Sequence, residues 1–149
     1  MISAEQIKKL REESGASMMD CKKALEQAGG DEARARELLS KRGAELAEKK
    51  AERKTNSGIV ESYIHANQKI GAILELYCET DFVARNENLK ALAHEICLQI
   101  TAVGAQTPEE LLSQPYLKNP AKTIKDLISD AVGKLGENIK VGKFVRFEL

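Results

Sequence analysis

The side chains able to carry out nucleophilic or acid–base chemistry are few in this 149-residue chain. His65 and His94 are the only histidines, and the cysteines are Cys21, Cys78 and Cys97. His94 and Cys97 can face each other on one helix, but a catalytic pair also needs an orienting group and a pocket. An odd number of cysteines without a CxxC pair indicates neither a disulfide framework nor a zinc site. We therefore expect the three thiols to be buried. We also expect that the chain is not an enzyme and that it binds no metal or cofactor.

The stretch Glu79–Asn86 places an acid and a large apolar ring where a β-patterned run stops and a long amphipathic helix begins. Asp81 at the start of a helix is favoured by the helix dipole. Phe82 precedes Leu89 by seven residues, so it shares the apolar stripe of the helix if that helix runs unbroken from Asp81. Two interpretations are therefore open for Phe82: a core residue, or an exposed wedge that pushes into another molecule.

Charge and composition exclude several classes of protein. Lysine plus arginine equals aspartate plus glutamate at 23 each, and aromatic residues make up only 4% of the chain, so no nucleic-acid interface is indicated. The basic stretch Glu48–Lys54 is most simply a solvated connecting helix. No apolar run approaches the roughly 20 residues of a membrane span, and no secretory signal opens the chain. We expect a cytoplasmic protein that contacts neither nucleic acid nor membrane.

The first 46 residues predict a module of three short helices. Ser3 with Gln6, and Ser17 with Asp20, have the spacing of capping boxes, and Asp31 is a suitable N-cap for the third helix. Helices this short must share one small core to be stable. The expected organisation is a three-helix module at 1–46, a basic and helical linker at 47–57, and a core domain at 58–149.

From residue 58 the pattern changes to alternating apolar residues. Two strands over residues 58–64 and 72–78 are expected to form an antiparallel hairpin with a turn at Asn67–Lys69. A helix with one apolar stripe follows from Leu89 to Val103. Another begins at Thr107–Pro108 and is interrupted at Asn119–Pro120, and a last helix ends at Gly136 before a third strand over residues 141–149. The predicted class is α+β, with a three-stranded antiparallel sheet packed on helices.

Both faces of this sheet carry apolar side chains. We expect the face toward the helices to consist of Val60, Ile64, Leu74, Leu76, Val141, Val145 and Phe147. The other face then holds Ile59, Tyr63, Ile73, Tyr77 and Phe144, although a solvated sheet face is usually polar. Apolar patches of this kind commonly mark contact sites. A second copy of the chain is our first candidate for the cover, and the chain's own N-terminal module or linker is the second.

Several segments together resemble the elongation factor Ts family, and the resemblance extends over essentially the whole chain. They are Arg11, Ser14–Leu25, Glu79–Ala84 and Gly136–Ile139. The resemblance implies a ubiquitin-associated-like three-helix module and a core domain with a three-stranded antiparallel sheet. It also implies a guanine nucleotide exchange factor of translation elongation, acting on the GTPase elongation factor Tu. An adaptor built on the first module is the alternative, since fold does not fix function.

The family's functional positions can be carried over onto matching residues. Thr80, Asp81, Phe82 and Val83 would push into the GTPase and displace the Mg²⁺ that helps hold GDP. Further partner contacts are implied at two other places in the chain: Met19, Lys22, Leu135 and Gly136. Larger members have a second core copy and a helical hairpin that this chain lacks, so it resembles a short form, and short forms act as dimers. With no cysteine near Val145, a noncovalent pair is expected.

Overall fold

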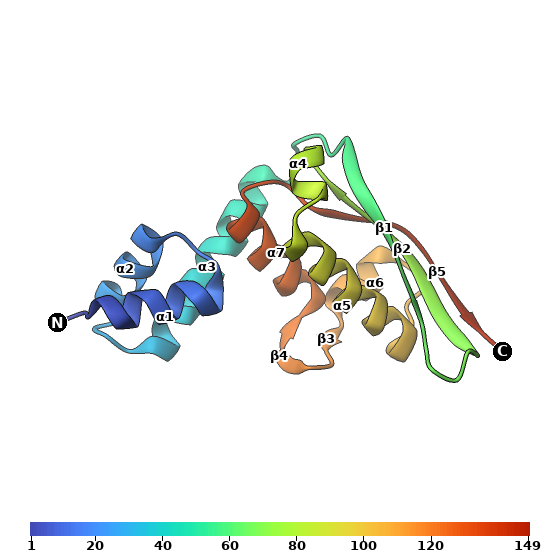
Figure 1. Ribbon diagram of the computed structural model, residues 1–149, viewed down its shortest axis with the longest axis horizontal. Coiled ribbons are helices and arrows are strands. Elements are labelled where there is room, and N and C mark those ends of the chain that lie inside the picture. The colour runs from blue at the N-terminus through green and yellow to red at the C-terminus, as the bar shows by residue number, and fades with distance from the viewer.

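Three helices form the N-terminal unit of the computed structural model, which describes all of residues 1–149 (Figure 1). They are α1 (Ala4–Ser14), α2 (Met18–Gln27) and α3 (Glu32–Lys50). Ser3 and Gln6 form a complete capping box, while Ser17 and Asp31 cap the other two helices with their side chains. These helices share one small core, as expected: Leu10, Cys21, Ala24, Leu25, Ala28 and Ala35.

Helix α3 is longer than the module requires. The expected boundary at residue 46 falls inside it, and the helix continues to Lys50 before the chain turns toward the sheet. Its second half packs on α7 (Ile124–Leu135), with Gly43 and Gly133 at the closest approach. A Cβ added at Gly133 would lie 3.0 Å from the Gly43 Cα, so the two helices meet backbone to backbone. The N-terminal unit is thereby joined directly to the core domain.

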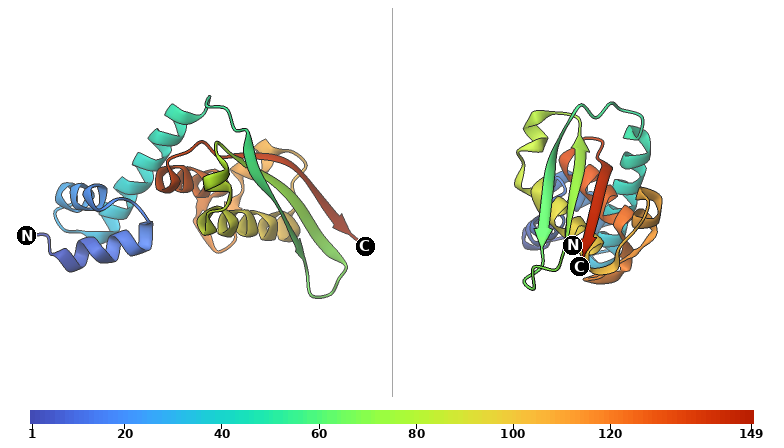
Figure 2. Two further views of the ribbon diagram at one scale, coloured as in Figure 1. Left: turned by 45° about the horizontal axis from the view of Figure 1, so that its top comes forward. Right: turned by 90° about the vertical axis from the view of Figure 1, so that its right-hand side faces the viewer.

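The core domain contains a three-stranded antiparallel sheet in the order β1–β2–β5. The strands are β1 (Ser57–Ile64), β2 (Ile70–Cys78) and β5 (Lys140–Glu148). Figure 2 shows the helices gathered behind one face of this sheet. They include α4 (Asp81–Ala84), α5 (Glu87–Val103), α6 (Pro108–Ser113) and α7, and the buried cluster of 17 residues lies between them and the sheet. The α+β class is confirmed.

The sequence interpretation assigned the faces of β1 and of most of β5 wrongly, and among the residues predicted for these two strands only Val141 packs on the core as expected. Val60, Ile64, Val145 and Phe147 were expected to pack on the helices, but they are 71%, 62%, 51% and 63% exposed. Directly opposed residues in an antiparallel pair share a face. Since Leu74 and Leu76 are buried, their partners Phe144 and Ile59 must point the same way, and so must Tyr63 opposite Ala72.

An apolar outer face of the sheet therefore exists, but among its exposed apolar residues only Ile73 was expected there. Its exposed apolar side chains are Val60, Ile64, Ile73, Val145 and Phe147. Neither the N-terminal unit nor the linker covers it: α1 and α2 lie at the opposite end of the molecule, and α3 packs on α7 rather than on the sheet (Figure 1). The right-hand view of Figure 2 looks onto this open face.

The segment between α6 and α7 also differs from the prediction of a helix interrupted at Asn119–Pro120. Helix α6 stops at Ser113, and a small hairpin follows, with β3 (Pro115–Tyr116) and β4 (Asn119–Thr123). The side chain of Gln99, only 1% exposed, donates to the Pro115 carbonyl at 3.1 Å and accepts from the Leu117 amide at 3.1 Å. A buried amide needs such partners, so Gln99 holds the hairpin in its extended shape.

Candidate functional site

Phe82 lies on a separate turn of helix before the long helix starts. Thr80 caps α4, which ends after four residues, and Asn86 caps α5 anew. This break removes Phe82 from the apolar stripe of α5, and its side chain is 83% exposed. Its neighbours Val83 and Ala84 are only 4% and 8% exposed and belong to the core. Val83 therefore anchors the turn, while Phe82 projects from it.

A carboxylate from a distant part of the chain supports this turn. Glu137, just after α7, accepts hydrogen bonds at one oxygen from the amides of Glu79, at 3.1 Å, and Thr80, at 3.0 Å. Its other oxygen accepts from the Thr80 hydroxyl at 2.7 Å. That hydroxyl in turn accepts from the Val83 amide at 3.3 Å, which is the N-cap bond of α4. Both ends of the Thr80–Val83 turn thus depend on Glu137.

A reciprocal set of contacts ties the loop after α7 to the linker. The Glu79 carboxylate accepts from the Asn138 amide at 2.8 Å. The side-chain amide of Asn138, which is 4% exposed, donates to the carbonyls of Ala51 and Arg53 at 3.2 and 2.8 Å. Lys50 donates to the Gly136 carbonyl and so caps the end of α7. The end of α3, the loop after α7 and the end of β2 therefore converge beneath the Thr80–Val83 turn.

The acidic residue of the turn is also held in place. The Ser57 hydroxyl donates to the Asp81 carboxylate. Beneath them, the Cys78 thiol donates to the Thr80 carbonyl at 3.2 Å. Burial raises the pKa of this thiol, and the nearby Glu137 and Asp81 carboxylates raise it further. Cys78 therefore remains a neutral packing residue.

The other predicted contact residues divide into two places. Leu135 and Gly136 adjoin Glu137, so they lie beside the Thr80–Val83 turn. Met19 and Lys22 are exposed on α2, in the N-terminal unit, well away from that turn (Figure 1). The chain thus presents two separate candidate contact regions.

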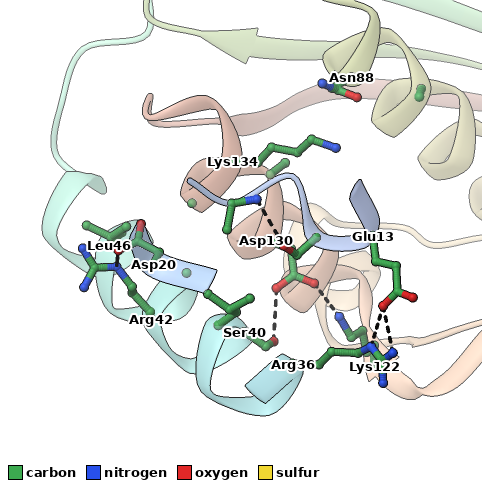
Figure 3. Close-up of a pocket in the computed structure, with 17 residues that line it drawn as sticks. Glu13, Asp20, Arg36, Ser40, Arg42, Leu46, Asn88, Lys122, Asp130 and Lys134 are labelled. Atoms are coloured by element: carbon green, nitrogen blue, oxygen red, sulfur yellow. Dashed lines mark hydrogen bonds and ion pairs between the residues drawn. The ribbon is translucent and has the colours of Figure 1, made fainter. Parts of the chain in front are cut away.

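The pocket between the N-terminal unit and the core domain does not have the features of a ligand site (Figure 3). Its charged side chains largely pair with one another: Arg36 with Glu13 at 2.8 Å, and Lys122 with Asp130 at 2.6 Å. Asp130 also accepts from the Ser40 hydroxyl at 3.1 Å. These bonds pair most of the charged groups within the chain, and only Lys134 among them has no such partner, so we interpret the pocket as the junction between the two units.

The spacing of His94 and Cys97 does not produce a nucleophile. Burial raises the pKa of Cys97 to about 12, and its thiol donates to the Glu61 carbonyl at 3.5 Å. A thiol needs a lowered pKa to act as a nucleophile at neutral pH. His94 instead meets the ring of Tyr63 edge to face, with ring centroids 6.0 Å apart.

Sequence reasoning did not identify Glu137, Asn138 and Ser57 as partners of the Thr80–Val83 turn. Glu137 and Asn138 stood inside a segment that carried the family resemblance, but their pairing spans almost sixty residues and leaves no trace in local spacing. Ser57 was taken only as the end of the linker. None of the helices is both long and apolar enough to cross a membrane.

Comparison with known proteins gives one consistent result. The family model described as "Elongation factor TS" matches residues 79–149, which include the Thr80–Val83 turn and Glu137. Elongation factor Ts of Thermodesulfovibrio yellowstonii is 42% identical over 192 aligned residues, covering 99% of this chain and 96% of the relative. That of Carboxydothermus hydrogenoformans is 38% identical over 194 residues, covering 100% and 89%.

The relatives differ from this chain in length. The alignment with the Thermodesulfovibrio protein spans 192 positions against the 149 residues of this chain, a difference of 43. Elongation factor Ts of Aquifex aeolicus is 45% identical over 152 residues, but these cover only 52% of that relative. The shared portion nevertheless includes nearly the whole of this chain.

Proposed function

Since this chain belongs to the elongation factor Ts family of translation elongation factors, we propose that it binds the GDP-bound GTPase elongation factor Tu and promotes GDP release. Release would favour reloading with GTP. The chain acts as a guanine nucleotide exchange factor in the cytoplasm, and it makes and breaks no covalent bond. The observation that carries this proposal is the exposure of Phe82, which is 83% accessible. It lies on a turn whose preceding backbone amides donate hydrogen bonds to the Glu137 carboxylate.

The mechanism is displacement. Magnesium in GTPases of this kind bridges phosphate oxygens and neutralises their charge, so moving it weakens the hold on GDP. Phe82 would enter the partner as an apolar wedge, with the Asp81 carboxylate beside it. Ser57 holds that carboxylate and Val83 anchors the turn, so little ordering remains to be done when the partner arrives.

Two further regions would complete the contact. Leu135 and Gly136, next to the turn, would touch the same part of the partner, while Met19 and Lys22 on α2 would hold it at a second point. Met19 is 62% exposed, which suits a contact residue. By thermodynamic linkage, the chain must bind nucleotide-free partner more tightly than GDP-bound partner by the same factor by which it weakens GDP binding.

We also propose that the chain pairs with a second copy of itself, without a disulfide, through the outer face of the sheet. The five apolar side chains there are between 44% and 71% exposed, and no part of this chain shields them. Ile73 and Val145 are directly opposed at the centre of this face. Since the three cysteines are buried elsewhere, the association would be noncovalent.

The test is release of fluorescently labelled GDP from elongation factor Tu, with the chain at about one tenth of the GTPase concentration and excess unlabelled GDP. We expect faster release with many turnovers per molecule of the chain. Chelating Mg²⁺ should shrink the acceleration, because displacement of an ion that is already absent contributes nothing.

The two results separate two claims. Release at the unassisted rate in the presence of Mg²⁺ would refute the exchange function. An acceleration factor that is unaffected by chelation would refute the displacement of Mg²⁺ and leave exchange by another route.

A further inference from the structure

We propose that Glu137 is a positioning residue that holds the Thr80–Val83 turn in its wedge conformation before any partner binds. This inference rests on the proposed function for its consequence in exchange, but the ordering of the turn is a property of the free chain. Glu137 is not offered as a contact with the partner, because both of its carboxylate oxygens already accept hydrogen bonds within the chain.

The turn needs such support because α4 is only four residues long. A single helical turn fixes several backbone angles for one hydrogen bond and is unstable by itself. Phe82 adds nothing to its stability, since the ring is 83% exposed. The anchors available are Val83 and Ala84 below, the Ser57 bond to Asp81, and the cap at Thr80.

Glu137 determines how the Thr80 hydroxyl acts as that cap. The hydroxyl has one proton, and it is donated to Glu137 at 2.7 Å. A lone pair of the same oxygen is thereby turned toward the Val83 amide, which it accepts at 3.3 Å. The other carboxylate oxygen secures the amides of Glu79 and Thr80. One charged group thus orders the backbone on the strand side of Phe82 and, through Thr80, on its helix side.

Glu137→Gln tests this assignment with nearly the same shape. Glutamine has one acceptor oxygen where glutamate has two. Its carbonyl oxygen can accept hydrogen bonds in place of one carboxylate oxygen, but the NH2 group in the other place cannot accept the Thr80 proton. In the free chain, amide hydrogen exchange of Glu79 and Thr80, followed by NMR, should accelerate at least about tenfold, since bonds to a charged acceptor are among the stronger ones. Glu109→Gln, an exposed carboxylate on α6, should leave both amides unchanged.

Nucleotide exchange then separates positioning from general loss of structure. We expect Glu137→Gln to lower the GDP release rate at saturating chain about tenfold, and to lower it no further when Phe82→Ala is already present. Unchanged protection of the two amides would overturn the proposal. So would losses that multiply in the double variant, because Glu137 would then act independently of Phe82. If the wild-type chain fails to accelerate GDP release, the proposed function is refuted, and the amide measurement alone decides whether Glu137 orders the turn.

Discussion

Replacing Phe82 with alanine should abolish most of the exchange activity. A phenylalanine side chain buries about 150–250 Å² when fully enclosed. Phe82 is 83% exposed, so roughly 170 Å² remains available for burial in the partner. At about 25 cal/mol per Å² that burial is worth roughly 4 kcal/mol, or about a thousandfold in rate. This is an upper limit for Phe82→Ala, since alanine retains the Cβ.

The same exposure predicts that the substitution leaves the fold intact. The ring has little contact with the rest of the chain, whereas large core residues replaced by alanine typically cost 3–5 kcal/mol or so. We expect the free energy of unfolding in urea to change by less than about 0.5 kcal/mol, the range of ordinary surface substitutions. Exchange and stability should therefore respond very differently to this one change.

The assay is stopped-flow release of fluorescent GDP from elongation factor Tu, over a range of chain concentrations. Leu117→Ala is the matched control, because Leu117 is also an exposed apolar residue, at 52%, but lies in the turn between β3 and β4. Release within threefold of the wild-type rate would refute the wedge. A large loss of stability would show instead that the ring packs within the chain.

Three further predictions concern pairing, stability and pH. Val145→Glu places a charge opposite Ile73 on the outer face, so we expect it to convert the dimer to a monomer in sedimentation at micromolar concentration. The control Leu117→Glu should leave the dimer intact. A dimer that persists in Val145→Glu would exclude this face as the interface. Asn138→Ala should lower the free energy of unfolding by roughly 2 kcal/mol, because two carbonyls lose their donor, and a change below about 0.5 kcal/mol would contradict that role. Burial opposes ionisation of Glu95, but hydrogen bonds from Lys118 and Tyr116 outweigh it and lower its pKa below the usual 4.5. The folded state then loses stability as the pH falls below about 4.5. In Glu95→Gln, the free energy of unfolding in urea should therefore fall less steeply between pH 7 and 3 than in the wild type. An unchanged pH dependence would contradict the assignment.

Local chemistry made much of the fold predictable. Capping residues such as Ser3, Asp31 and Thr107 mark where helices begin, and each accepts the expected backbone amide. The alternation in β2 and the stripe along α5 from Leu89 to Ile100 also agree with the structure, because burial on one side leaves a periodic pattern. Val103, expected at the end of that stripe, is instead 49% exposed in the last turn of the helix. These features depend on residues only a few positions apart.

The features that could not be predicted depend on residues distant in the sequence, or on a choice between two faces that are equally apolar. Alternation alone could not orient β1, since Ile59 and Val60 are equally apolar and only pairing with β2 decides between them. The hairpin after α6 depends on Gln99, which lies in the preceding helix. For Phe82, the break at Arg85–Asn86 decides its exposure, and a continuous apolar stripe gave no sign of it.

The backbone contact between Gly43 and Gly133 determines how far apart the two candidate contact regions lie. Helix α3 runs from the unit that carries Met19 to the loop beneath Phe82, and its contact with α7 leaves no room for a side chain between them. The distance between α2 and the Thr80–Val83 turn therefore follows from the packing of these two helices. In the proposed complex, a partner bound at α2 would meet Phe82 at a distance that this helix contact sets.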